Sequence, residues 1–353
     1  MNALIYHASH DVRYTEGAPR PSPKQNQVLL RVQHAGICGS DLHEYTHGPE
    51  TIPTSAHPLT NSTVPCPFGH EFAGTVVSDT SLLSASKAPL SSGTKVVVDP
   101  RLYCHECINC KAGYTNGCAK FGSHGISGCC GGFGEYAAVD ASMCHVVPPD
   151  TDMSLAPLCE PLAVAWHAVN LAGIDSFRGK NVLSLGGGPI GIAVIFVLKL
   201  WGAWEEGSKV WVSEPSTRRR EQCEALGATA VDPTKADIGK VCMDGTNGKG
   251  AEFVFDCAGS GLGMKDGFEA LAHRGTYINL ALWGSPFTLP FARFLFKEAT
   301  VKGSMCYTDD EFAATVKAFA EGRVMTRFIG ASPLIASQAS SMAAKQWLQV
   351  VYR

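Results

Sequence analysis

The spacing of apolar residues changes near residue 180, and the change predicts two domains of different kinds. The first part of the chain carries short β-type runs among many glycines and prolines, which is typical of a mainly antiparallel, loop-rich domain. The second part alternates continuous apolar runs with helical stretches, which predicts a parallel sheet covered by helices. The expected strands are residues 28–32, 74–77, 95–98, 181–185, 209–213, 252–256 and 276–280, and the expected helices are residues 190–200 and 217–226.

The last part of the chain is less regular. After about residue 290 we expect one helix, at residues 309–321. The Ser-rich stretch at residues 81–92 is interpreted as a surface loop. The expected domains are a first one at residues 1–155, completed by residues 291–353, and a second one at residues 156–290.

Length and composition fit two globular domains and argue against two kinds of partner. A chain of 353 residues exceeds what one hydrophobic core usually organises. The net charge of −3 comes without a basic run long enough to follow a phosphate backbone, so we expect no nucleic-acid partner. The apolar run at residues 190–201 is too short to cross a bilayer, so no membrane segment is expected. The first ten residues show no secretory signal, and a cytoplasmic location is therefore expected.

Four closely spaced cysteines form the most specific motif. Cys104, Cys107, Cys110 and Cys118 follow the pattern C-x2-C-x2-C-x7-C in a loop that contains glycines. Four thiolates joined by short spacers can close a tetrahedron around Zn²⁺ and leave no position for a substrate, which describes a structural zinc site. Unrelated thiols or a redox pair are the alternative, which the tight spacing disfavours.

A second set of metal-ligating residue types is spread over a longer span. Cys38 lies in Gly-Ile-Cys-Gly-Ser-Asp, His70 and Glu71 lie in Gly-His-Glu-Phe-Ala-Gly, and Glu160 precedes a proline. Three protein ligands with one exchangeable position make a catalytic zinc site. Each of these residues taken singly is more often a core or surface residue than a ligand. The adjacent glycines, where the backbone can turn, favour the metal interpretation.

A glycine-rich motif follows the first apolar strand of the second part. Gly186, Gly188 and Gly191, with Pro189 and Ile190 between the last two, fit the pattern G-x-G-x-x-G. The motif stands after a strand and before a helix, where glycines let the backbone approach a pyrophosphate and the helix N-terminus meets its charge. This context predicts a dinucleotide site.

The strand that follows ends at an acidic residue. The carboxylate of Glu214 can accept hydrogen bonds from ribose hydroxyls at this position and would repel a 2′-phosphate, which favours NAD over NADP. Arg219 and its neighbour Arg218 could accommodate that phosphate, or they could be the solvated start of a helix.

Taken together, these motifs resemble the zinc-containing medium-chain dehydrogenases over almost the whole chain to about Met325. The residues that carry the resemblance are 36–41, 69–74, 104–118, 131–136 and 159–167. Residues 41–45 and the insertion 57–60 look most like the 2,3-butanediol dehydrogenases, with sorbitol-type polyol dehydrogenases next. The Ala/Ser-rich residues 328–353 depart from the family, whose members end with a helix and a strand that complete the first domain.

The resemblance implies an α/β protein with a GroES-like, mainly-β catalytic domain and a Rossmann, doubly wound nucleotide-binding domain. It implies two Zn²⁺ per chain and NAD as cofactors. Cys38 and His70 would bind the catalytic zinc, while Glu71 and Glu160 would share the carboxylate position or hold its water.

A proton relay is also expected, because zinc lowers the pKa of a bound hydroxyl and the proton needs a route to solvent. The resemblance implies that Ser40 contacts the substrate oxygen and that His43 ends the relay. The alternatives are a turn hydroxyl for Ser40 and a surface imidazole for His43.

The expected activity is a zinc- and NAD-dependent interconversion of a secondary alcohol or vicinal diol and its ketone, with a butanediol- or acetoin-like substrate. A polyol dehydrogenase of the sorbitol or xylitol type would use the same residues. A zinc- and NAD-binding relative without turnover is the other alternative, and the complete ligand set argues against it. The family also implies a homo-oligomer, either a dimer or a tetramer.

Overall fold

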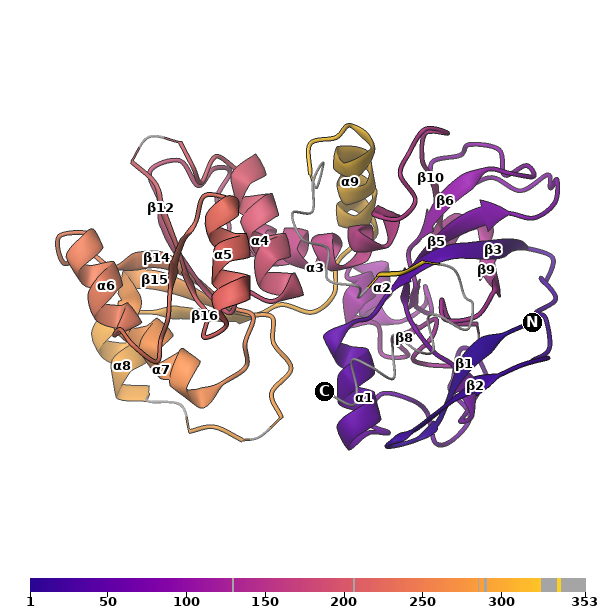
Figure 1. Ribbon diagram of the computed structural model, residues 1–353, viewed down its shortest axis with the longest axis horizontal. Coiled ribbons are helices and arrows are strands. Elements are labelled where there is room, and N and C mark those ends of the chain that lie inside the picture. The colour runs from indigo at the N-terminus through magenta and orange to yellow at the C-terminus, as the bar shows by residue number, and fades with distance from the viewer. Residues whose placement is uncertain (129, 206, 285, 289–290, 325–334, 338–353) are drawn as a thin grey trace. The chain divides into compact units, whose positions relative to one another are not determined.

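A computed structural model describes residues 1–324, except 129, 206, 285, 289 and 290, together with residues 335–337 (Figure 1). Within these residues the chain divides into two compact units. One contains Met1–Glu160 and Thr308–Gly322, and the other contains Pro161–Tyr307. The predictions for residues 328–353 lie outside the described residues, except for Ile335–Ser337, which form a strand.

The first unit is built on an antiparallel sheet of the GroES-like kind. Its strands follow the order β10-β6-β5-β3-β17, with β9 also paired to β3. Alternate residues of β3 are buried, as expected of a strand with one face on the core. The strands of this sheet are β3 (Gln27–Gly36), β5 (Glu71–Val76), β6 (Lys95–Val98), β9 (Tyr136–Asp140), β10 (Cys144–Val146) and β17 (Ile335–Ser337).

Smaller elements complete the first unit. A three-stranded sheet contains β1 (Ala3–Ala8), β2 (Asp11–Thr15) and β4 (Cys66–Pro67), and a two-stranded ladder joins β7 (Arg101–Leu102) to β8 (Gly122–Ser123). The helices are α1 (Gly39–His47), α2 (Ile108–Lys111), the start of α3 (Cys159–Asn170) and α9 (Asp309–Ala320). Helix α9 lies where the sequence predicted one, and its capping box joins Thr308 to Glu311.

The interpretation of residues 81–92 as a surface loop is wrong at two positions. Leu90 is fully buried in the core of the first unit, and Ser84 is buried as well. The segment folds back on itself, because the Leu90 N–H donates to the Leu82 carbonyl at 3.2 Å. Leu90 anchors the stretch in the core and Leu82 packs beside it, and the high serine content hid both.

The second unit is a doubly wound parallel sheet. Its strand order is β13-β12-β11-β14-β15-β16, and every neighbouring pair is parallel. The order of the chain reverses between β11 and β14, so helices cover both faces of the sheet (Figure 1). The strands are β11 (Asn181–Leu185), β12 (Lys209–Ser213), β13 (Thr229–Val231), β14 (Ala251–Asp256), β15 (Leu271–Asn279) and β16 (Thr300–Gly303), and the helices are α4 (Pro189–Leu200), α5 (Thr217–Ala225), α6 (Ile238–Gly245), α7 (Gly261–Ala270) and α8 (Phe291–Lys297).

The boundary after this sheet differs from the one expected at residue 290. Residues Thr300–Gly303 pair in parallel with β15, so the second unit continues to Tyr307. This strand is short and mostly exposed, and it therefore lacks the apolar run that marks the central strands. No helix among the described residues is long and apolar enough to span a membrane.

Candidate functional site

Three of the four residues proposed for the open metal site lie together. The Cys38 thiol, a ring nitrogen of His70 and a carboxylate oxygen of Glu71 all lie within 4.8 Å of one another. Cys38 is the N-cap of α1, and the other two residues stand where β5 begins. The turn before them uses Gly69, whose φ of +87° an L side chain rarely adopts. The donor set of thiolate, imidazole and carboxylate is one that Zn²⁺ accepts.

A buried aspartate orients the imidazole of this group. Asp41 is fully buried, and its Oδ1 lies 3.2 Å from Nδ1 of His70. The other ring nitrogen, Nε2, lies 3.3 Å from the Ser40 hydroxyl. A carboxylate on Nδ1 leaves Nε2 free as a ligand, which is the usual partner of a metal-bound histidine. Burial alone would lower the pKa of His70, but the negative charges of Asp41 and Cys38 raise it well above its ordinary value.

Asp41 was missed by sequence reasoning as part of the site. Its other oxygen, Oδ2, accepts the Cys38 backbone N–H at 2.9 Å and so completes a capping box at the start of α1. One aspartate therefore holds both Cys38 and His70. The signal available was an acidic residue three positions after the cysteine, which by itself indicates only a helix start.

Glu71 occupies a space that only a glycine leaves open. A Cβ added to Gly36 would lie 2.1 Å from Oε2 of Glu71, and the two residues are paired across β3 and β5. Burial raises the pKa of Glu71 to about 8, and the nearby carboxylate of Glu160 contributes to the shift. Glu160 is itself buried but lies outside the group of three. A divalent cation bound here would offset the free-energy cost of burying these negative charges.

The two residues proposed for the relay lie on successive turns of α1. Ser40 faces the imidazole of His70, as described above. Nδ1 of His43 lies 3.6 Å from a carboxylate oxygen of Glu50, and its ring centroid lies 5.0 Å from that of His47. The side chain of His43 is 21% exposed, so it can exchange a proton with solvent. Glu50 was not singled out from the sequence.

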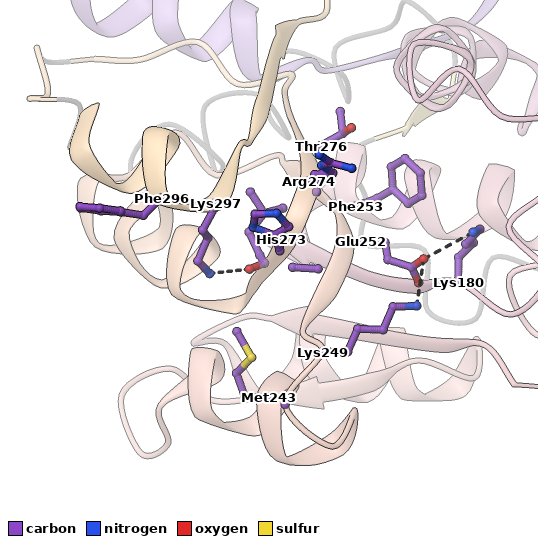
Figure 2. Close-up of a pocket in the computed structure, with 14 residues that line it drawn as sticks. Lys180, Met243, Lys249, Glu252, Phe253, His273, Arg274, Thr276, Phe296 and Lys297 are labelled. Atoms are coloured by element: carbon purple, nitrogen blue, oxygen red, sulfur yellow. Dashed lines mark hydrogen bonds and ion pairs between the residues drawn. The ribbon is translucent and has the colours of Figure 1, made fainter.

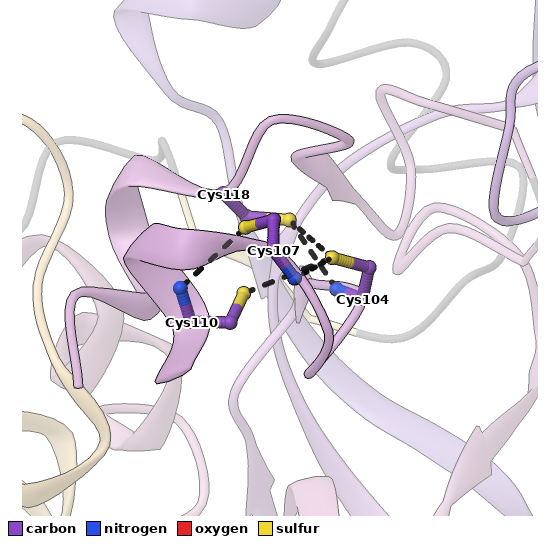
Figure 3. A group of neighbouring side chains, drawn as sticks. All are labelled: Cys104, Cys107, Cys110 and Cys118. Atoms are coloured by element: carbon purple, nitrogen blue, oxygen red, sulfur yellow. Dashed lines mark hydrogen bonds between the residues drawn. The ribbon is translucent and has the colours of Figure 1, made fainter. Parts of the chain in front are cut away.

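The four cysteines of the compact motif converge in space, as Figure 3 shows. The Sγ atom of Cys104 lies 3.5 Å from that of Cys118 and 4.0 Å from that of Cys110. A Zn–S bond length near 2.3 Å implies sulfur–sulfur distances of about 3.8 Å in a tetrahedron. The geometry therefore fits a zinc ion.

Backbone N–H groups point at these sulfur atoms. The Cys107 N–H donates to Sγ of Cys104 at 3.3 Å, and the Lys120 N–H donates to Sγ of Cys118 at 3.3 Å. Such donors favour the thiolate, and the backbone N–H groups of Cys110 and Ala119 lower the pKa of Cys107 to about 6.

The glycine-rich motif stands where β11 meets α4. Gly186 has a φ of +94°, and a Cβ on Gly191 would lie 2.1 Å from the Gly186 carbonyl oxygen. Both positions therefore require glycine. Gly188 is the N-cap of α4 and makes no side-chain cap, and Pro189 and Ile190 form the first turn. Pro189 has no N–H, so the N–H groups that follow it in the first turn are the ones that face an anion, and no side chain caps them.

Glu214 lies beside this motif at the end of β12. It is buried, and its carboxylate accepts the N–H groups of Gly187 and Ser216, both at 2.8 Å. Arg219 comes within 3.8 Å of the same carboxylate, and its side chain is 54% exposed. The neighbouring Arg220 is instead tied to the Glu214 and Pro215 carbonyls.

A second buried aspartate supports the other loop at this edge of the sheet. Oδ1 of Asp256, at the end of β14, accepts the N–H groups of Ala258 and Gly259, both at 3.0 Å. Its Oδ2 accepts the Tyr277 hydroxyl at 2.7 Å. The sequence analysis expected a strand at residues 252–256 and assigned Asp256 no role.

Comparison with known proteins agrees with this architecture. Residues 24–149 match the family described as alcohol dehydrogenase GroES-like domain, and residues 189–321 match the family described as zinc-binding dehydrogenase. A probable diacetyl reductase ((R)-acetoin forming) of Saccharomyces cerevisiae is 34% identical, over 92% of this chain and 81% of that protein.

Solved structures give the same result. The 2R,3R-butanediol dehydrogenase of Bacillus subtilis is 32% identical, with a TM-score of 0.81, over 91% of this chain and 88% of that one. A zinc-binding dehydrogenase from Sinorhizobium meliloti, solved with NADP, is 30% identical, with a TM-score of 0.77, over 92% and 89% of the two chains.

The chain therefore belongs to the zinc-dependent medium-chain dehydrogenases, which confirms the family and the fold class predicted from the sequence. It is a zinc-dependent alcohol dehydrogenase. Within the family it resembles the butanediol dehydrogenases in particular.

Proposed function

We propose that the protein interconverts a vicinal diol and its α-hydroxyketone, with a butanediol- or acetoin-like substrate and NAD as the hydride acceptor. The observation that carries this proposal is the group of half-buried Cys38 with buried His70 and Glu71, beside which the Ser40 hydroxyl stands. The names of the relatives support the substrate class. When bound, Zn²⁺ supplies Lewis acidity toward the substrate oxygen, and the nicotinamide takes up the hydride.

The chain's own residues hold the site and move the proton. Cys38, His70 and Glu71 would hold the ion, and Glu160, buried nearby, would serve as an alternative carboxylate. The Ser40 hydroxyl would accept the substrate proton as it gives up its own, so that its oxygen stays neutral. The imidazole of His43, paired with Glu50 and partly exposed, passes the released proton to solvent.

The cofactor proposal rests on the cradle formed by Gly186, Gly188 and Gly191, which brings a pyrophosphate to the N-terminus of α4, where no side chain caps the helix. The Glu214 carboxylate keeps acceptor capacity beyond its two backbone bonds and would bind the ribose hydroxyls. NAD is proposed over NADP because that buried carboxylate would repel a 2′-phosphate. The four-cysteine cluster would hold the second, structural Zn²⁺.

One experiment tests the metal and the activity together. Purified protein is assayed for zinc content and for NADH formation with butanediol stereoisomers, sorbitol and xylitol, before and after chelation. We expect about two zinc ions per chain and the highest kcat/KM with a butanediol. The Cys38→Ser variant should lose one ion and the activity, whereas Cys306→Ser, a matched thiol outside both clusters, should keep them. Higher kcat/KM with sorbitol or xylitol would identify a polyol dehydrogenase. Two ions without turnover would identify a binding protein.

We also propose a homo-oligomer that forms along the edge of the parallel sheet. Strand β16 ends the sheet, which leaves a row of backbone groups able to pair with a second copy. Large apolar side chains are exposed in this strand and in the segments just before and after it along the chain: Leu282, Phe291, Leu295, Val301 and Met305. Light scattering of the protein and of Val301→Lys tests this, and a monomer in both cases would refute it.

A cytoplasmic location is proposed from the thiols. The four thiols of the Cys104–Cys118 cluster and the Cys38 thiol would have to stay reduced to hold Zn²⁺, so the chain suits a reducing compartment. This proposal is tested by fractionating cells, locating the protein among the fractions and measuring whether its thiols are reduced.

A further inference from the structure

A cavity of about 580 Å³ lies at the amino-terminal edge of the parallel sheet, and none of the residues discussed above lines it (Figure 2). Lys180 directly precedes β11, Glu252 is the second residue of β14, and residues 271–276 are the start of β15. Cavities that hold small ligands usually measure roughly 300–1,000 Å³. The glycine-rich motif lies at the opposite, carboxyl-terminal edge, about 20 Å away along strands of this length.

Basic side chains outnumber acidic ones around this cavity. The ammonium groups of Lys180 and Lys249 lie 3.4 and 3.2 Å from the same Glu252 oxygen. Although burial alone would raise it, the pKa of Glu252 lies below its ordinary value because the Asn181 N–H and both ammonium groups favour the carboxylate. A single charged carboxylate thus faces two cations, each of which keeps further N–H donors.

A guanidinium extends this positive character on the β15 side. Arg274 has a φ of +60°, a conformation that favours glycine, and it stands where the pairing of β15 with β14 changes register. Its Nε donates to Glu298 at 2.7 Å, and the side chain is 74% exposed, so the two terminal nitrogens remain available. His273 beside it reaches the same carboxylate only at 3.8 Å.

The walls of the cavity also offer room for an organic body. Phe296 of α8 is 79% exposed and lines the cavity, together with the side chain of Met243. The ammonium of Lys297 on the same helix donates to the Glu269 and Leu271 carbonyls. The cavity therefore combines cationic donors with an exposed aromatic ring.

We propose that this cavity is a second ligand site, distinct from the cofactor site, that binds a small phosphorylated organic molecule. The Arg274 guanidinium and the Lys249 and Lys180 ammonium groups hold the phosphate, because guanidinium and ammonium donors match its oxygens in charge and spacing. Phe296 contacts the organic part.

The test uses the zinc-loaded protein saturated with NADH, so that the cofactor site is closed to phosphate. Inorganic phosphate and AMP are titrated by calorimetry, with chloride at matched ionic strength as the reference. We expect one phosphate site per chain and tighter binding of AMP. Arg274→Gly removes the guanidinium at a backbone angle that glycine prefers, so its effect is not one of misfolding, and we expect phosphate affinity to fall about tenfold or more. Lys249→Gln should act in the same direction.

Lys317→Gln is the matched control, because this exposed lysine of α9 lies outside the cavity. It should leave phosphate binding unchanged. Phe296→Ala should weaken AMP but not phosphate. The proposal is overturned if phosphate does not bind once NADH is present, if Arg274→Gly and Lys249→Gln bind it as the parent does, or if the Lys317 variant weakens it equally. If AMP binds no more tightly than phosphate, the proposed contact between Phe296 and the organic part of the ligand is wrong.

Discussion

Replacing Gly36 by alanine places a methyl group where the Glu71 carboxylate lies. The added Cβ would stand 2.1 Å from Oε2 of Glu71, whereas carbon and oxygen in contact are about 3.3 Å apart. The carboxylate must therefore retreat by about 1.2 Å. The backbone cannot take up this shift easily, because Gly36 and Glu71 are paired within the sheet.

The fold itself should tolerate the change. Gly36 does not use a φ reserved for glycine, so the entropic gain of Gly→Ala, about 0.4–1 kcal/mol, offsets part of the roughly 1–3 kcal/mol that the added methyl group costs in a packed site. A displaced ligand or supporting group at a metal site costs about 10- to 100-fold in metal affinity or activity, equivalent to ~1.4–2.7 kcal/mol. We expect Gly36→Ala to fold with a slightly lower melting temperature, to lose zinc affinity at one site, and to lower kcat/KM by this factor.

Gly39→Ala is the matched control, because it lies in the same motif and its added Cβ meets nothing within 4 Å. Zinc bound per chain is measured after dialysis at graded free Zn²⁺, together with kcat/KM and thermal melting. Since both changes act on one carboxylate, Gly36→Ala combined with Glu71→Ala should be no worse than Glu71→Ala alone. Full zinc occupancy and activity in Gly36→Ala would refute the assignment of Glu71, and an equal loss in Gly39→Ala would show a general disturbance of the loop.

Three further changes test other parts of the molecule. Asp41→Asn should lower zinc affinity at the open site by about 10- to 100-fold, because the buried carboxylate orients the imidazole ligand; unchanged zinc content after dialysis would contradict this. Glu214→Ala should raise KM for NAD and reduce the preference for NAD over NADP, and an unaltered ratio of kcat/KM for the two cofactors would exclude this carboxylate from ribose binding. Burial alone would raise the pKa of Asp309, but the hydroxyl and guanidinium donors around it hold that pKa below its ordinary value. Its contribution to stability is then complete above the unfolded aspartate pKa of about 4 and is lost as pH falls through the folded pKa. Asp309→Asn should make the free energy of unfolding, measured by urea titration at several pH values, fall less steeply as pH decreases. If it falls as steeply as in the parent protein, another group causes the loss of stability in acid.

The central strands of the second unit could be predicted closely from the sequence. Strands β11 and β12 have the bounds that the apolar runs predicted, because parallel strands covered on both faces read as continuous apolar segments. The strand at the edge of this sheet, β16, was not predicted. The residues of β16 are largely exposed, so nothing in their pattern separates them from a loop, and the expected domain boundary was placed too early.

The contacts around the open site could not be derived from spacing. Gly36 and Glu71 come together only through the register of β3 with β5, which no local pattern states. Asp41 combines two roles, a helix cap and a partner of His70, and only the first has a local signature. The burial of Leu90 in the core could not be predicted either, because a single buried residue produces no periodic pattern in the sequence.

The four-cysteine cluster and the open site differ in the groups that would hold an ion. This difference explains why spacing along the sequence predicted the first cluster more specifically than the second. In the four-cysteine loop, short spacers bring backbone N–H groups to the sulfur atoms, and these donors lower the pKa of Cys107 to about 6 before any ion is considered. Local sequence therefore encodes the geometry of the cluster and favours the thiolate at Cys107, although burial and the neighbouring thiols raise the pKa of Cys110 to about 12. At the open site, burial raises the pKa of Glu71 to about 8 and raises that of the Cys38 thiol, and a bound cation would favour the ionised forms of both. The positions of the Cys38, His70 and Glu71 side chains depend on the packing of β3, β5 and α1. Sequence spacing does not state that packing, so their roles at the site could be predicted only from the resemblance to a family.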